Sequence, residues 1–448
     1  MKTRSWRHGF FCALVLTLAT VAVRAETSSA LPTISGPLTI ADAVLTALKY
    51  NPMLQAAGFQ ASAAQARVGM AKAMTRPLVA VSAFAGKSSM GDIVTSPPNI
   101  MPSAILAFPN KGAVVGQAGF MFPIYTGGRL NGVVRSAEAL SAAAGSDRVS
   151  VEQEVSLETR TAYHGALLTS ATVEVYRDLV NEERERVRIA EAAFREGKIA
   201  KYDLLRNQSG LAEAEQQLAN AERDSRIGIV EMKAALGVSQ SSDISLADQL
   251  AYCKVTETLD SLVERAIENR PELSAARSRV RSALKNVDVA KSAYSPVIYA
   301  SAMQGITSTS DGSDSGLTAG VAVGIPLVDG GGRRAAVAEA RAMLEAMKRE
   351  EQQAVVGIER DVHTAWAEVQ AADKNVGLSE AAVAQAGEDY RVIKLRYEAG
   401  KAINVEVLDA LASLVRARNN RLTALYEHSV AGDKLARAIG ELRTGGSP

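Results

Sequence analysis

The clearest pattern in the chain is an alternation of apolar residues with small or polar ones near position 320. The apolar members are Leu317, Ala319, Val321, Val323 and Ile325, and the residues between them are Thr318, Gly320, Ala322 and Gly324. A period of two predicts a β-strand with one apolar face. Other stretches alternate more loosely, and we predict two strand pairs, 78–88 with 113–123 and 297–307 with 316–327.

Each predicted strand has about ten residues, which is the length that a tilted strand needs to cross a bilayer. Two segments join the strands within each pair, a proline-containing stretch at 88–112 and a Ser-, Asp- and Gly-rich stretch at 308–316. Both are predicted to be loops. A hairpin in a soluble β-sandwich would have the same length. The strands alone therefore leave both interpretations open.

Very long helices are predicted after each strand pair. Residues 127–196 and 330–399 contain no proline and are rich in helix formers, so each helix would extend about 100 Å. Return helices are predicted at 201–236 and 402–440, and shorter helices precede the first strand pair at 39–50 and 52–75. Because 52–75 and 201–236 together nearly match 127–196 in length, we expect two half-length helices to stack end to end beside each long one.

The return helices carry apolar residues at coiled-coil spacing. The first has Leu204, Leu211 and Leu218, and the second has Leu408, Leu411, Val415, Leu422 and Leu425. Steps of three, four or seven predict packing along a seam. With few aromatic residues and much alanine, the helices are suited to extended pairwise packing rather than to a thick core.

The whole pattern occurs twice. Pro52 recurs as Pro271, 219 positions later, whereas Pro123 recurs as Pro326 and Gly197 as Gly400, both 203 positions later. This period is far longer than the ~20–50 residues of solenoid repeats. We therefore predict two domain-sized structural repeats, 26–250 and 251–448, which differ mainly in one loop.

The N-terminus and the composition indicate an exported protein. Residues 1–25 combine a basic start, a short apolar run and a Val-Arg-Ala exit, which predicts a secretory signal peptide. Removing it takes away Lys2, Arg4, Arg7 and Arg24, which leaves 46 of the 50 basic residues against 49 acidic ones. This balance argues against nucleic acid as a partner. Cys253 would be the one remaining cysteine, so no intrachain disulfide is expected.

Transmembrane strands impose a condition on assembly. Open sheet edges in lipid leave backbone N–H and C=O groups unpaired, and each costs several kcal/mol, so a spanning sheet must close. The smallest barrels have about eight strands, and this chain offers four. Several chains must therefore contribute to one barrel, from which the long helices would continue as a tube.

Two pairs of motifs carry a resemblance to a known family. The strand exits at 122–129 (FPIYTGGR) and 325–333 (IPLVDGGGR), and the turns at 194–203 (FREGKIAKYD) and 397–406 (YEAGKAINVE), resemble the TolC family of outer-membrane efflux and secretion channels. The resemblance covers essentially the whole chain after residue 25. It implies a mostly α protein that is a homotrimer, with a 12-stranded β-barrel in outer-membrane lipid, four strands per chain. A long α-helical barrel would continue into the periplasm.

The resemblance also implies partners and a gate. Such channels are exit ducts that work with a periplasmic adaptor and an inner-membrane transporter. The tip turns would meet the adaptor through Gly197, Lys198, Gly400 and Lys401, where each glycine fits a helix C-terminus.

The family places constriction acids on Glu406 and Asp409, with Asp203 as the counterpart of Glu406. A symmetric ring of carboxylates would select cations or bind a divalent ion. Acids also favour the first turn of a helix through the helix dipole, and this second interpretation stays open. Ala402 stands where some family members have a basic residue that holds the tip closed, so a lock of that type is not expected here.

Signals for an enzyme are poor. Gly330 to Arg333 is followed by no Gly-Lys-Ser/Thr, so a phosphate loop is not indicated. His164, His363 and His428 lack metal-ligand spacing. We therefore expect no catalytic residues, metal or cofactor. The alternative function is a soluble periplasmic coiled-coil adaptor, although such proteins usually offer one helical hairpin and this chain repeats its full element order.

Overall fold

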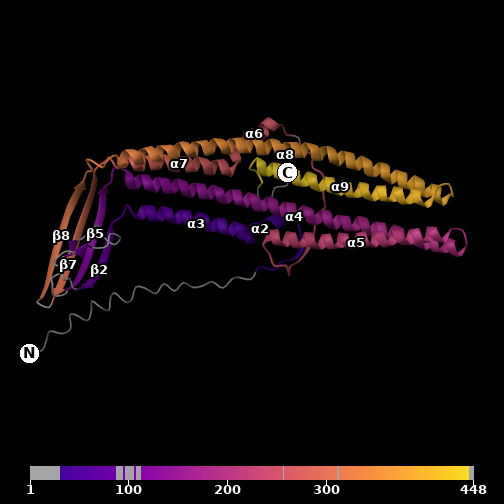
Figure 1. Ribbon diagram of the computed structural model, residues 1–448, viewed down its shortest axis with the longest axis horizontal. Coiled ribbons are helices and arrows are strands. Elements are labelled where there is room, and N and C mark those ends of the chain that lie inside the picture. The colour runs from indigo at the N-terminus through magenta and orange to yellow at the C-terminus, as the bar shows by residue number, and fades with distance from the viewer. Residues whose placement is uncertain are drawn as a thin grey trace, which may run out of the picture.

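The computed structural model describes residues 31–86, 94–95, 105–106, 113–255, 257–309 and 312–442. The predicted signal peptide, 1–25, lies outside these residues, as does most of the predicted loop before residue 112. The described part is an elongated molecule with a sheet at one end and two helical turns at the other (Figure 1).

Two helices of 67 residues run the length of the molecule, α4 (Arg129–Arg195) and α8 (Gly332–Glu398). Four shorter helices lie beside them: α3 (Pro52–Ala73), α5 (Lys201–Leu236), α7 (Pro271–Ser292) and α9 (Asn404–Ala438). Both α3 and α5 pack on α4, and both α7 and α9 pack on α8. The expected end-to-end stacking of half-length helices beside each long one is confirmed.

The sheet is antiparallel with the strand order β2-β5-β7-β8. Its members are β2 (Leu78–Gly86), β5 (Ala113–Tyr125), β7 (Val297–Thr309) and β8 (Gly312–Gly324). Among the described strands, β2 pairs only with β5 and β8 pairs only with β7. The sheet of a single copy therefore has two open edges.

The bounds of the last strand correct our prediction. We expected a strand at 316–327, but β8 covers Gly312–Gly324, and the predicted loop 308–316 is mostly strand. Pro326 has no N–H to donate to a strand partner. Its carbonyl, together with that of Leu327, instead accepts hydrogen bonds from the Arg333 guanidinium at 2.7 and 3.2 Å. These bonds hold the chain in the turn that leads into α8.

A second correction concerns the long connection between β2 and β5. We predicted a loop there, but the described residues include a short antiparallel pair, β3 (Val94–Thr95) with β4 (Ile105–Leu106). Pairs of two residues carry too little pattern to be recognised in a sequence.

The strand register separates an apolar face from a small and polar one. Val81 lies opposite Ala118, and Leu317 lies opposite Gln304, which in turn pairs with Ala118. On this face Val79, Leu317 and Val321 are 70%, 71% and 64% exposed. The next row across the sheet, on the other face, is Ser82, Gln117, Gly305 and Gly316. In a single copy of the chain, the apolar face of the sheet is therefore largely exposed.

A small belt surrounds the middle of the helices and was not fully predicted. It contains α2 (Ile40–Tyr50), α6 (Leu259–Asn269) and a parallel pair, β1 (Ser35–Leu38) with β6 (Asp243–Leu246). Tyr163 of α4 lies buried under this belt, where its hydroxyl is 2.8 Å from the Leu38 carbonyl. Burial raises the pKa of Tyr163, so the hydroxyl keeps its proton and serves as a donor.

The seam of α5 differs in detail from the prediction. The coiled-coil pairing of α4 with α5 and of α8 with α9 is present, but Leu204, Leu211 and Leu218 are only half-buried. The buried positions also recur every seven residues, but they lie three residues after the leucines: Asn207, Ala214, Ala221, Gly228 and Ala235. A Cβ on Gly228 would lie 2.8 Å from the Thr169 hydroxyl. Small residues thus let α4 and α5 approach closely, and the leucines flank the contact.

None of the helices in the described part of the chain combines the length and the apolar character that crossing a bilayer requires.

Candidate functional site at the helical tip

The two turns at the far end of the molecule share one geometry. At the end of α4, Gly197 has φ +71° and the N–H of Lys198 donates to the Ala193 carbonyl at 2.8 Å. At the end of α8, Gly400 also has φ +71° and the Lys401 N–H donates to the Arg396 carbonyl at 2.7 Å. This is the Schellman arrangement, in which glycine adopts the left-handed conformation cheaply. The structure thus places the four predicted tip residues together at the exposed end.

The predicted constriction acids lie on the helices that return from these turns. Glu406 and Asp409 are both exposed on α9, and Asp203 is half-buried on α5. Asp203 and Glu406 each lie in the first helical turn, as the helix-dipole interpretation requires. No ion pair is formed by any of the three with the other residues that the structure describes. All three carboxylates remain available to other copies, ions or ligands.

A polar bridge that the sequence did not reveal joins the helices just above the tip. The Arg186 guanidinium of α4 donates to Asn404 Oδ1 at 3.0 Å, and Asn404 Nδ2 donates to Asn207 Oδ1 of α5 at 3.2 Å. Asn207 is 3% exposed. Its place among the small residues of the α5 seam is the signal that could have identified it, since a buried polar side chain in a coiled coil fixes register.

A second bridge connects α4 with α8. Glu182 Oε2 accepts a hydrogen bond from the Tyr390 hydroxyl at 3.1 Å and lies 3.3 Å from Lys394 Nζ. Burial, followed by the nearby Glu182 charge, raises the pKa of Tyr390 to about 12, so the phenol is a donor at physiological pH. Ala402 had argued against a basic lock at its own position. Lys394 instead supplies a basic contact between the two helix pairs.

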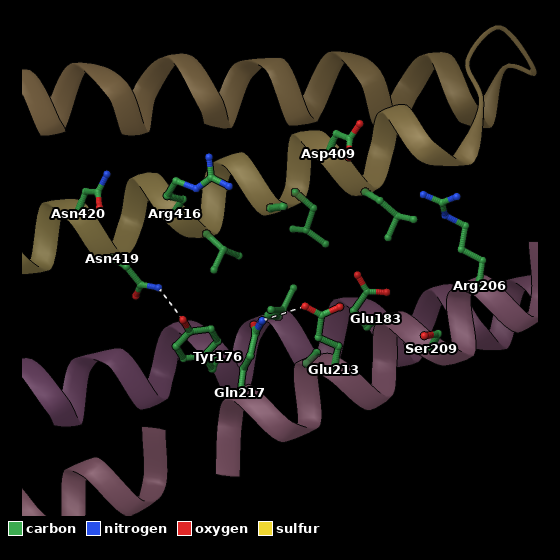
Figure 2. A pocket seen from close by; sticks show the side chains of 17 residues that line it. Tyr176, Glu183, Arg206, Ser209, Glu213, Gln217, Asp409, Arg416, Asn419 and Asn420 are labelled. Atoms are coloured by element: carbon green, nitrogen blue, oxygen red, sulfur yellow. Dashed lines mark hydrogen bonds between the residues drawn. The ribbon is translucent and has the colours of Figure 1, made fainter. Parts of the chain in front are cut away.

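A cavity of about 710 Å³ lies beside these bridges, between α4, α5 and α9 (Figure 2). Acidic and basic side chains line it, and the acidic ones are Glu183 of α4, Glu213 of α5 and Asp409 of α9. The predicted constriction acid Asp409 therefore shares a wall with a buried carboxylate that the sequence analysis did not select.

His164 and His428 are packing residues, whereas His363 is exposed on α8. His164 lies 3.2 Å from Asp433, and His428 is 4% exposed and stacks beside the Tyr252 ring. Burial lowers the pKa of His428, which keeps the imidazole neutral. Within the described ranges, no three His, Cys, Asp or Glu side chains are close enough together to hold a metal ion.

The comparisons with known proteins identify the class of protein first. Among solved structures, the CmeC outer membrane channel of Campylobacter jejuni has a TM-score of 0.74 at 14% identity, with 94% of this chain and 90% of that chain covered. The outer membrane protein VceC of Vibrio cholerae has a TM-score of 0.70 at 19% identity, with 90% and 96% covered. The fold is therefore that of the outer-membrane channels with a helical barrel.

The family follows from the sequence itself. The model of the outer membrane efflux protein family matches residues 44–238 and 262–441, so the chain belongs to that family. Protein CyaE of Bordetella pertussis is 26% identical over 420 residues, which cover 91% of this chain and 84% of the relative. Outer membrane protein TolC of Escherichia coli is 23% identical over 193 residues, which cover 43% of this chain and 36% of that protein.

Family membership confirms the resemblance carried by the strand exits and the tip turns. The protein is an exit duct of the outer membrane, and the soluble-adaptor alternative is not favoured. Its family consists of channel proteins rather than enzymes.

Proposed function

We propose that three copies of the chain close into one duct, each contributing four strands and two repeats, 26–250 and 251–448. The main support is that the contact between the two repeats is made once inside the chain, whereas the equivalent contact on the other side of the repeats is not made. Strand β5 pairs with β7, and helix α4 packs on α7. Their counterparts by the sequence offsets are β8 with β2 and α8 with α3, and these pairs do not pack within one copy. A neighbouring copy would complete both.

Exposed apolar residues on those two helices support the proposal. Phe59 and Met70 of α3 are 76% and 69% exposed, and Met343 and Val356 of α8 are each 57% exposed. Isolated apolar residues on a surface are ordinary, but these lie on the two elements that lack their counterpart contact. A head-to-tail contact of this kind closes a ring when the rotation per copy is right.

The glycine pairs at the start of α4 and α8 differ in the same way. A Cβ on Gly127 would lie 2.3 Å from the Ser295 Cβ, whereas a Cβ on Gly330 would meet nothing within 4 Å. Ser295 has Arg76 as its counterpart, 219 positions earlier. We propose that Arg76 of the next copy occupies the space beside Gly330.

The proposed duct receives cargo at the tip and releases it through the barrel. A periplasmic adaptor would contact the turns through Gly197, Lys198, Gly400 and Lys401, and would connect the duct to an inner-membrane transporter. The duct conducts passively, because energy is supplied by the transporter. The tip projects into the periplasm, and the apolar sheet face meets outer-membrane lipid.

We further propose a gate at the tip. Glu406, Asp409 and Asp203, repeated by symmetry, would form the constriction. The Glu182 contacts with Tyr390 and Lys394 would hold the two helix pairs of each copy together in the arrangement described here.

Single-channel recording in planar bilayers tests the gate. Neutralising both acids of α9, Glu406→Gln with Asp409→Asn, should weaken cation selectivity and block by divalent cations, because a ring of carboxylates attracts cations. A matched control neutralises Glu345 and Glu350, which are exposed on α8 nearer to the sheet. Selectivity and block that match the wild type in the α9 variant would remove these acids from the gate.

A further inference from the structure

A buried carboxylate in the wall of the helical barrel has no structural explanation. The Glu183 side chain of α4 is 5% exposed, and its Oε1 accepts one hydrogen bond from the Arg186 guanidinium at 3.3 Å. Its Oε2 is buried and has no hydrogen-bond donor among the described residues. Burial raises the pKa of Glu183, against the opposing effect of Arg186. An unpaired buried carboxylate oxygen costs free energy, so its presence calls for a partner.

The residue that carries the unpaired oxygen lines the 710 Å³ cavity, beside a glycine of α5. Both Glu183 and Gly210 line this cavity, and a Cβ on Gly210 would lie 3.4 Å from Oε2. Such a Cβ would make an ordinary van der Waals contact with the carboxylate oxygen and would cover it on the side of α5. Glycine at position 210 therefore keeps the space next to Oε2 open. In Figure 2 the Glu183 carboxylate lies between the α5 and α9 ribbons.

The repeat does not require this carboxylate. The counterparts of Glu183 and Gly210, 203 positions later, are Ala386 and Ser413. The same two elements thus pack in the second half of the chain without an acid at this position. Packing of the long helix on its return helix therefore does not explain Glu183, and its role is specific to the first repeat.

The lining of the cavity defines the kind of ligand that fits. Three carboxylates, Glu183, Glu213 and Asp409, face two guanidinium groups, Arg206 and Arg416, which leaves one negative charge in excess. Apolar side chains complete the wall, among them Leu179, Leu411 and Val415. The volume is in the range of sites for small organic molecules, roughly 300–1,000 Å³. Charge and shape together favour a monovalent cation with an apolar body.

We propose that this cavity binds a small organic cation, whose ammonium or amidinium group donates a hydrogen bond to Glu183 Oε2 while its apolar part contacts the leucines of α4 and α9. The ligand touches both helix pairs at once and shares the cavity wall with Asp409. Binding of this cation does not depend on the proposed gate, so the two proposals can fail separately.

Benzamidine is a suitable probe because benzamide and benzoate have nearly the same shape with neutral and negative charge. Calorimetric titration of the full assembled protein in detergent should give saturable benzamidine binding, with a Kd on the order of 1 mM for a ligand of this size. Benzamide should bind at least about tenfold more weakly, and benzoate should not bind, because a charge-assisted hydrogen bond is lost.

Variants assign the binding to this site. Glu183→Gln should weaken benzamidine binding by about tenfold or more, and Gly210→Ala should weaken it less, because its methyl group takes up space beside Oε2. The matched control is Glu185→Gln, an exposed acid on the same helix that pairs with Arg188 and should leave affinity unchanged. Thermal melts show whether each variant is folded, and Glu183→Gln is expected to fold because glutamine keeps the shape of the side chain and an oxygen that can accept from Arg186.

Three results would overturn the proposal. These are no saturable benzamidine binding up to about 10 mM, equal affinity for benzamide, or unchanged benzamidine affinity in a folded Glu183→Gln variant. Channel recordings on Glu183→Gln distinguish the cation site from the proposed gate. If this variant loses benzamidine binding but keeps the cation selectivity of the wild type, the result supports the cation site and leaves the gate unaffected.

Discussion

The two junctions at which half-length helices meet solve one packing problem with different side chains. At the first, between α5 and α3, Asn51 accepts a hydrogen bond from Met53 N at 2.8 Å and donates one to the Ala235 carbonyl at 2.9 Å. At the second, between α9 and α7, the Arg270 guanidinium donates to the carbonyls of Arg437 and Ala438, both at 3.3 Å. Each side chain thus donates to carbonyls at the C-terminus of the helix that ends at the junction, α5 or α9.

The backbone at the two junctions is nearly the same. Gly237 and Gly440 have φ +71° and +76°, and a Cβ on either would lie 2.8 Å from a backbone atom, of Asn51 or Asn269. The comparison teaches that close backbone approach is the fixed requirement, whereas the chemistry that caps the helix ends can change. Arg270 also pairs with Asp361 of α8 at 3.2 Å, which adds a charged contact that the first junction lacks.

The largest expected effect is the loss of either junction glycine. Gly237→Ala or Gly440→Ala should each destabilise the protein by about 3 kcal/mol, because a left-handed residue with a side chain costs about 1–2 kcal/mol and crowding adds a similar amount. Thermal melting followed by circular dichroism measures the shift. Gly197→Ala is the matched control, since it has φ +71° and no neighbour within 4 Å of its Cβ. Equal shifts at the three sites would show that close approach is unimportant.

A smaller effect is expected from the side chains. Arg270→Ala should cost about 2 kcal/mol, because it leaves buried carbonyls unpaired while the half-exposed acids are rehydrated. Arg270→Asn should recover about 1 kcal/mol of this by capping α7 as Asn51 caps α3. Melting of the two variants side by side checks the difference. Arg270→Asn no more stable than Arg270→Ala would mean that the two capping solutions are not interchangeable.

The sequence predicted the features that local chemistry determines. Proline-free stretches gave the long helices, and glycines at 197 and 400 marked their ends, because left-handed backbone favours glycine. The β1–β6 pair was missed because each strand has four residues and its partner is far away in the chain. The Glu182 and Asn207 bridges were missed for a similar reason, since they depend on how separate helices pack.

Closure of the sheet between copies is the central claim, and pairing across the open edges tests it most directly. Inside the chain, Phe120 of β5 lies opposite Ala302 of β7. Adding the 203-residue offset to Phe120 gives Val323, and subtracting the 219-residue offset from Ala302 gives Ala83. If the sheet closes between copies, Val323 of one copy therefore lies opposite Ala83 of the next.

Cysteine cross-linking in intact outer membranes measures this pairing. With Cys253→Ser as background, Val323→Cys combined with Ala83→Cys should give covalent dimers and trimers on oxidation, seen on denaturing gels, because opposite strand residues are close enough for a disulfide. Each single variant, and Val323→Cys combined with Ser82→Cys on the other sheet face, should give far less. Absence of cross-linked species in the membrane-inserted Val323→Cys/Ala83→Cys protein, or equal yield with Ser82→Cys, would contradict the account.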